Sequence, residues 1–110
     1  MKPAVIHLKA RAAIRSFPEG VRRELGKAIF DLQKGEKISM PMARPMPTVA
    51  AGVEELRVKD RSGAYRVFYY LKLADSVLIF HAFVKKTPKT PTHEIAVARK
   101  RLKEMLDEET

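Results

Sequence analysis

The chain of 110 residues contains no cysteine and no tryptophan. Without cysteine there is no disulfide bond, thiol nucleophile or thiolate ligand for a metal ion, which is compatible with a cytoplasmic protein. No apolar run approaches the ~20 residues that a membrane-spanning helix needs. The start of the chain, Met1 to His7, lacks the apolar segment and cleavage site of a signal peptide. The sequence therefore predicts a cytoplasmic protein that is not bound to a membrane.

Acidic residues are too few to balance the basic ones. The 13 Asp and Glu residues face 22 Lys and Arg residues, which leaves a formal net charge of +9. Hydrophobic residues make up 45% of the chain and charged residues 32%, as in an ordinary globular protein, and the length suits a single domain, 1–110. A small domain with so large an excess of positive charge predicts binding to nucleic acid.

Helical patterns occupy both ends of the chain. The segment from Lys9 to Arg15 favours a short helix, and the run Val5–Leu8 fits either a first strand or the lead-in to that helix. A second helix begins near Pro18 and ends at Gly35, and a last helix follows Pro91. Their apolar stripes consist of Val21, Leu25, Ala28, Ile29 and Leu32 in the second helix and of Ile95, Ala98, Leu102, Met105 and Leu106 in the last.

The middle of the chain has the pattern of a three-stranded meander. A connector rich in proline and methionine, Glu36 to Gly52, comes first, and its prolines forbid a regular helix or a central strand. Strands are predicted over Val53–Lys59, Tyr65–Lys72 and Ser76–Lys85. The fold class is α+β, with an antiparallel sheet of three to four strands flanked by two N-terminal helices and a C-terminal helix. We expect the helices to pack on one face of the sheet and to leave the other face open to a ligand.

The segment from Arg57 to Tyr70 concentrates four cations in a predicted hairpin. Side chains alternate along a strand, so Arg57 and Lys59 point to the same face, and the turn at Gly63 brings Arg66 back beside them. Uncompensated cations on one face repel each other across strands, and a polyanion over that face would remove the repulsion. The alternative is a solvated outer face with no specific role.

Other candidate binding groups lie on the strands that follow. Phe68 and Tyr70 share the face of the hairpin arginine and could stack on a base. The pair Lys85-Lys86 ends the last strand and is either a solubilising edge or a phosphate-binding pair. His81 lies in an otherwise apolar strand and is either a structural residue or a titrating group of a site.

Motifs of the familiar enzyme classes are missing from the chain. No histidine has a carboxylate at a metal-binding spacing, no serine lies in a nucleophile motif, and there is no glycine-rich phosphate loop. We therefore predict neither a metal nor a cofactor.

Four segments, in this order along the chain, carry a resemblance to a known family: residues 55–59 (ELRVK), 63–69 (GAYRVFY), 83–91 (FVKKTPKTP) and 94–96 (EIA). The chain resembles the RelE-superfamily toxins, and most closely the HigB-like, phage-derived branch of bacterial type II toxin–antitoxin systems. The resemblance implies a toxin that cleaves mRNA in the ribosomal A site and acts in the cytoplasm. It also implies inhibition by a cognate antitoxin, a small helix-turn-helix protein.

The resemblance further implies roles for individual residues. The cations expected to hold the scissile phosphate are Arg57, Arg66, Lys85 and Lys86. The expected chemistry is attack by the ribose 2′-hydroxyl on the adjacent phosphate, which leaves a cyclic phosphate and needs no metal. Apart from the resemblance, we expect Lys59, Arg61, Phe68 and Tyr70 to contact flanking RNA, and His81 is a candidate acid or base. The resemblance adds His93 as a second candidate, because it is the histidine nearest to the final helix.

Two other functions fit the same residues. One is a non-catalytic module of the same fold that binds RNA or the ribosome, which the lack of an obvious proton acceptor favours. The other is a basic adaptor that binds proteins.

Overall fold

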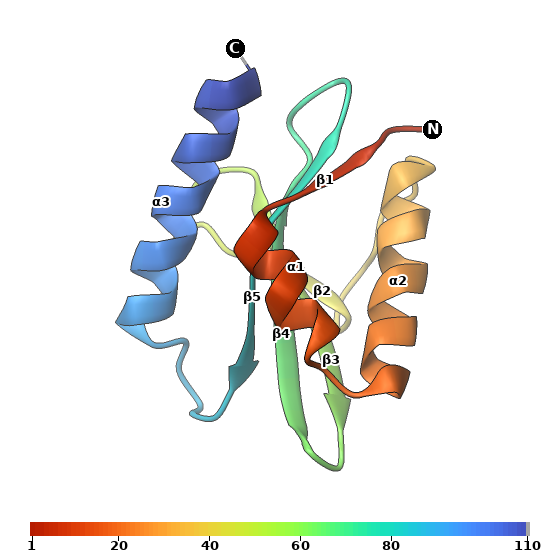
Figure 1. The fold of residues 1–110 in the computed structure, drawn as a ribbon, viewed down its shortest axis with the longest axis vertical. Helices are drawn as coiled ribbons and strands as arrows, with labels where there is room; N and C mark the ends of the chain where they lie inside the picture. Colours follow the sequence, from red (N-terminus) through yellow and green to blue (C-terminus); the bar gives the residue numbers. More distant parts are fainter. Residues whose placement is uncertain (110) are drawn as a thin grey trace.

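A computed structural model describes residues 1–109 of the chain (Figure 1). Its elements follow in the order β1 (Ala4–Ile6), α1 (Leu8–Arg15), α2 (Glu19–Gln33), β2 (Ala43–Pro45), β3 (Val53–Asp60), β4 (Gly63–Tyr70), β5 (Val77–Lys85) and α3 (Thr92–Glu109). The α+β class and the three helices agree with the prediction. Within the described residues, no helix is both long and apolar enough to cross a membrane.

The strands form one sheet in the order β1-β5-β4-β3-β2. The meander of β3, β4 and β5 is antiparallel, as predicted, but β1 pairs with β5 in parallel, so the sheet is mixed. The sheet also has more strands than predicted, because part of the connector forms β2 at the edge beside β3. Proline is tolerated there, since an edge strand can leave one row of N–H positions unused, and β2 ends at Pro45.

Helices cover both faces of this sheet (Figure 1). The residues Leu56, Val67 and Tyr69 pack on one face with buried side chains of α2, whereas Phe68 and Phe80 pack on the other with α3. The prediction that all helices lie on one face is therefore wrong. The physical reason is that β4 and β5 carry apolar residues on both faces, and each face needs a cover.

The two long helices have the predicted buried stripes. In α2 the buried residues are Val21, Leu25, Ala28 and Leu32, and in α3 they are Ala98, Leu102 and Met105. Gly35 follows α2 with a φ of 88°, a left-handed conformation that glycine adopts without strain. A loop joins the end of β5 at Lys85 to the start of α3 at Thr92. The end of β5 projects beyond the first turn of α3 (Figure 1).

Candidate nucleic-acid interface

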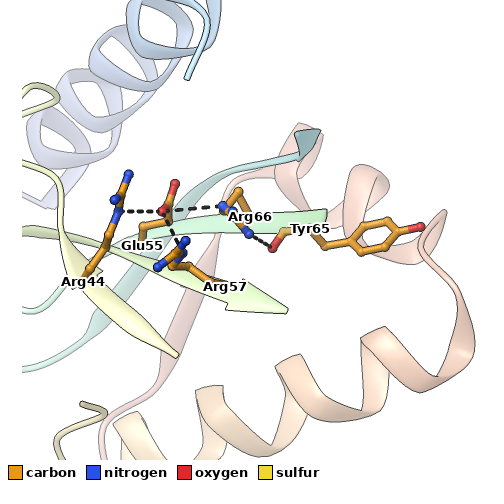
Figure 2. Close-up of polar contacts among 5 residues, drawn as sticks. All are labelled: Arg44, Glu55, Arg57, Tyr65 and Arg66. Carbon is orange, nitrogen blue, oxygen red and sulfur yellow. Dashed lines mark hydrogen bonds and ion pairs between the residues drawn. The ribbon is translucent and has the colours of Figure 1, made fainter. Parts of the chain in front are cut away.

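The strand register places four charged residues side by side across three neighbouring strands, β2, β3 and β4. Arg57 of β3 lies directly opposite Arg66 of β4, and Arg44 of β2 lies directly opposite Glu55 of β3. Glu55 and Arg57 are two residues apart on one strand and therefore share a face. This group of four, which we call the arginine–glutamate cluster, is shown in Figure 2.

One carboxylate oxygen joins the three arginines of the cluster (Figure 2). The Oε1 atom of Glu55 lies 3.2 Å from Nε of Arg44, 3.6 Å from Nε of Arg66 and 3.9 Å from Nε of Arg57. The Glu55 side chain is 0% exposed and that of Arg66 is 8% exposed, whereas Arg44 and Arg57 are about one-third exposed. Of these contacts, the one with Arg44 is short enough to be a hydrogen bond.

Hydrogen bonding inside the arginine–glutamate cluster is incomplete. The Oε2 atom of Glu55 and the Nε atoms of Arg57 and Arg66 are buried without a hydrogen-bond partner in the described part of the chain. A second Arg66 nitrogen donates to the carbonyl of Tyr65 at 3.5 Å, which is a weak contact (Figure 2). The two Nε atoms are buried and face Glu55 Oε1, so an anion that brings oxygen atoms of its own would reach them by displacing this carboxylate.

Burial and neighbouring charge lower the pKa values of two cations at the cluster, Arg66 and Lys85. Burial lowers the pKa of Arg66; Glu55 opposes this shift, and Arg57 and Arg44 add to it. The pKa of Lys85 is also lowered, first by burial and then by the nearby positive charge of Arg66. Arg66 remains a cation at neutral pH, since an arginine starts from a very high pKa. Lys85 becomes a better proton donor than an ordinary lysine.

A surface hollow of about 620 Å³ lies against the cluster. It brings together four of the residues predicted for the site, Arg57, Lys59, Arg66 and Lys85. The other two predicted cations, Arg61 and Lys86, are exposed and do not line it. One acidic residue, Glu24, also lines the hollow, so its lining carries a net positive charge, as a site for a phosphate group requires.

The predicted aromatic platform is not available to a base. Phe68 is 0% exposed, and its ring packs against Phe80, His81 and Phe83. The prediction that Phe68 stacks on RNA is wrong for this structure, because α3 covers its part of the sheet face. Tyr70 is half-buried against the same apolar cluster and does not line the hollow.

His81 is a buried link between β5 and α3. Its Nε2 atom lies 2.7 Å from Oε1 of Glu94, and its Nδ1 atom lies 2.9 Å from a guanidinium nitrogen of Arg101. A guanidinium can only donate, so Nδ1 accepts and the ring is neutral, with its one N–H donated to Glu94. Neither His81 nor the exposed His93 lines the hollow, so the structure does not bring these two acid–base candidates to the cations.

We expect His81 to make the protein sensitive to acid. Burial lowers the pKa of His81 below its usual 6.5, and Arg101 and His93 lower it further, against the opposing effect of Glu94. The unfolded chain therefore takes up this proton first as pH falls, and the stability that the neutral ring contributes above pH 6.5 is lost as pH passes through the folded-state pKa. Urea denaturation at pH 7.5 and at pH 5 measures this loss.

The matched variants are His81→Gln and His93→Gln. His81→Gln should lower stability at pH 7.5 by roughly 1–3 kcal/mol, the cost of disturbing a buried hydrogen-bonded group, and should weaken the dependence on pH. His93 is exposed, so His93→Gln should behave like the wild-type protein. An unchanged pH dependence in His81→Gln would show that another group is responsible. His81→Gln should also lower the melting temperature more than it lowers specific activity.

Comparison with known proteins identifies the family of this chain. Residues 12–103 match the family described as Phage derived protein Gp49-like (DUF891). The chain belongs to this family.

Solved structures similar to this Gp49-like protein include two of the E. coli toxin RelE. A free-state variant of RelE, in which two arginines are replaced by alanine, matches with a TM-score of 0.57 and 18% identity over 94% of this chain and 97% of that one. The isolated toxin matches with a TM-score of 0.55 and 20% identity over 91% and 99%. A search of curated proteins gave no match. The likeness confirms the predicted RelE fold.

Two residues of the cluster in this Gp49-like protein were not predicted as site residues. Glu55 compensates the cations, so the expectation of an uncompensated basic face is wrong. The sequence does contain a sign of this role: Glu55 lies two residues before Arg57 on the same strand, which places both side chains on one face. Arg44 gives no such signal, because its place depends on the pairing of β2, which the proline-rich connector conceals.

Proposed function

We propose that this Gp49-like protein is the toxin of a type II toxin–antitoxin system and cleaves mRNA on the ribosome. The observation that carries the proposal is the convergence of Arg57, Arg66 and Lys85 on one hollow beside a buried carboxylate. The phage-derived family and the likeness to the fold of the E. coli toxin RelE support it. Its site of action is the cytoplasm.

The proposed reaction is a transfer within the RNA chain. The ribose 2′-oxygen bonds to the adjacent phosphorus, the bond from phosphorus to the 5′-oxygen breaks, and the products are a cyclic phosphate and a 5′-hydroxyl. Arg57 and Arg66 bind the phosphate oxygens, on which charge accumulates. Lys85, with its lowered pKa, gives a proton to the leaving 5′-oxygen.

The proton of the 2′-hydroxyl needs an acceptor, and Glu55 is the carboxylate of the cluster. In the structure the Glu55 side chain is fully buried; its Oε1 atom is held by the arginines, and its Oε2 atom has no hydrogen-bond partner among residues 1–109. A phosphate that binds the same guanidinium groups would compete with this carboxylate and free it to take the proton. Glu55 thus has two proposed tasks, since it also orients the arginines before RNA binds.

Two macromolecular partners follow from this function. The ribosome presents the mRNA, and a cognate antitoxin, a small helix-turn-helix protein, blocks the toxin. We propose that the antitoxin covers the hollow with an acidic or amphipathic segment, because such a segment complements a cationic lining.

A test of catalysis uses two neighbouring lysines. Production of the wild-type protein should arrest growth, and primer extension on a translated message should map discrete cuts. Lys85→Ala should slow cleavage by about 10²- to 10⁴-fold, the usual contribution of a general acid. Lys86→Ala is the matched control, because Lys86 is exposed and does not line the hollow.

The second candidate function is a module that binds RNA or the ribosome without cutting. The complete burial of Glu55, together with the near-complete burial of Arg66, favours it, since these groups already pair with each other. A wild-type protein that binds the ribosome but leaves translated message intact would establish this function and contradict catalysis.

RNA binding itself should be strongly dependent on salt. With a net charge of +9, the protein should neutralise roughly three to six phosphates, and each contact on a single strand adds about 0.7 to the slope of log affinity against log salt. The expected slope is therefore about −2 to −4, measured by fluorescence anisotropy between 50 and 300 mM salt. A flat response would contradict binding through phosphates.

A further inference from the structure

A second hollow, of about 630 Å³, lies beside the first. It is formed by the connector before β3, by the loop after β5 and by the first turn of α3. Its walls are mainly apolar and include Met40, Pro45, Met46 and Ile95. The volume falls within the range of roughly 300–1,000 Å³ that is typical of sites for small ligands or single groups.

The two hollows meet at the arginine–glutamate cluster. Arg44 lines the second hollow, while Arg57 and Arg66 line the first, and all three contact the same oxygen of Glu55. Pro88, in the loop after β5, lines both hollows. A ligand whose phosphate binds Arg66 therefore has its next group close to Arg44.

The lining of the second hollow also has a charge preference. Its charged residues are Arg44 and Lys89, and no acidic side chain of the described residues belongs to it. A neutral or acidic protein segment could use the apolar walls. However, arginines of the two hollows contact the same oxygen atom of Glu55, so the second hollow lies next to the one proposed to bind phosphate. This position favours a group that is covalently attached to a phosphate. In RNA that group is a nucleoside.

We propose that the second hollow binds one nucleobase of the RNA strand, immediately next to the phosphate held by Arg57, Arg66 and Lys85. This inference rests on the proposed RNA substrate and adds the base-binding site. The flat guanidinium group of Arg44 offers a stacking surface for the base, as arginine does in complexes with single-stranded RNA. Methionine and proline side chains enclose it, since methionine adapts to the shape of its neighbour.

The test uses short RNAs that cannot be cut, because each ribose carries a 2′-O-methyl group. One position at a time is made abasic, so the phosphates remain and only a base is lost. In the wild-type protein, loss of the base at one position next to the central phosphate should weaken binding by about 5- to 20-fold, the lower part of the range for base stacking. Loss of bases farther away should change affinity by less than about 2-fold.

Two variants change the hollow without changing the cations. The Thr48→Leu/Thr92→Leu protein fills it from two exposed positions, and Met40→Ala removes an exposed apolar wall. Ala12→Leu is the control for added apolar bulk, because it places a leucine on the exposed side of α1, away from the hollow. In the filled protein, intact RNA should bind as weakly as the abasic RNA. Met40→Ala should show a smaller loss at the same position, which keeps the test valid if the filled protein does not fold.

The outcomes separate this inference from the proposed function. If RNA binds in an Arg66-dependent manner but every variant keeps the wild-type penalty for the abasic position, the base site is wrong and the phosphate site stands. If the filled protein binds RNA normally and loses only its antitoxin, the hollow is a protein-docking surface and the inference is overturned. If RNA binding does not depend on Arg66, the proposed function itself fails.

Discussion

Arg66→Ala should slow RNA cleavage by about 30- to 1000-fold. In the proposed reaction Arg66 binds one phosphate through two guanidinium nitrogens, and loss of one preorganised donor to developing charge costs roughly 2–4 kcal/mol of transition-state stabilisation. Arg66 lies directly opposite Arg57 in the β3–β4 register, so the two can hold the same phosphate group. The measurement is primer-extension mapping of message cleaved during translation, at equal concentrations of folded protein.

The control for this substitution must take burial into account. The sequence predicted that Arg66 lies on an open face of the sheet, but the Arg66 side chain is 8% exposed and contacts Glu55. We therefore expect Arg66→Ala also to lower stability, by roughly 1–3 kcal/mol. Arg66→Lys keeps the charge beside Glu55 and should recover the fold better than the activity, because an ammonium group cannot reproduce bidentate contact. Cleavage at the wild-type rate by folded Arg66→Ala would remove Arg66 from the site.

Local patterns predicted the β3–β4 hairpin well. Alternation of side chains and a turn at Gly63 are properties of adjacent residues, and they place Arg57 opposite Arg66 as the structure has it. The parallel pairing of β1 with β5 joins segments far apart in the chain, and no local pattern specifies it. The cover of the second sheet face by α3 is a long-range property of the same kind, and it explains why Phe68 was assigned to the correct face but to the wrong environment.

The residues of the candidate site also fall into two groups: those that a local pattern predicts and those that depend on long-range structure. The cations of β3, β4 and β5 were predicted because each lies on a strand with a clear pattern. The partner that holds them together was not predicted: alternation places Glu55 on the face of Arg57, but a glutamate beside a second glutamate gives no sign that it is fully buried. Arg44 was missed because its strand has three residues and ends in a proline.

Glu55→Gln should be among the most destabilising single substitutions in this protein. The carboxylate is 0% exposed and is the shared partner of Arg44, Arg57 and Arg66. Removal of one partner from a buried ion pair typically costs 3–5 kcal/mol, because the remaining charge is left uncompensated. The midpoint of urea denaturation should fall by roughly 2 M, because the free energy of unfolding of a small domain falls by about 2 kcal/mol for each molar of urea. Glu54→Gln, at the neighbouring half-buried position on the opposite face, is the matched control and should lose less.

The origin of this loss can be tested in two ways, by removing one of the arginines and by supplying a free anion in place of the carboxylate. If repulsion among the three guanidinium groups destabilises Glu55→Gln, then Arg44→Gln should destabilise the wild-type protein but be neutral or stabilising in the Glu55→Gln background, with a coupling of about 0.5–3 kcal/mol.

Inorganic phosphate should raise the urea midpoint of Glu55→Gln more than that of the wild-type protein, compared with chloride at equal ionic strength. Such rescue would follow from phosphate binding where the carboxylate had been, which is the exchange proposed for the RNA backbone. Equal responses to phosphate in the two proteins would contradict that exchange and leave Glu55 a purely structural partner of the arginines.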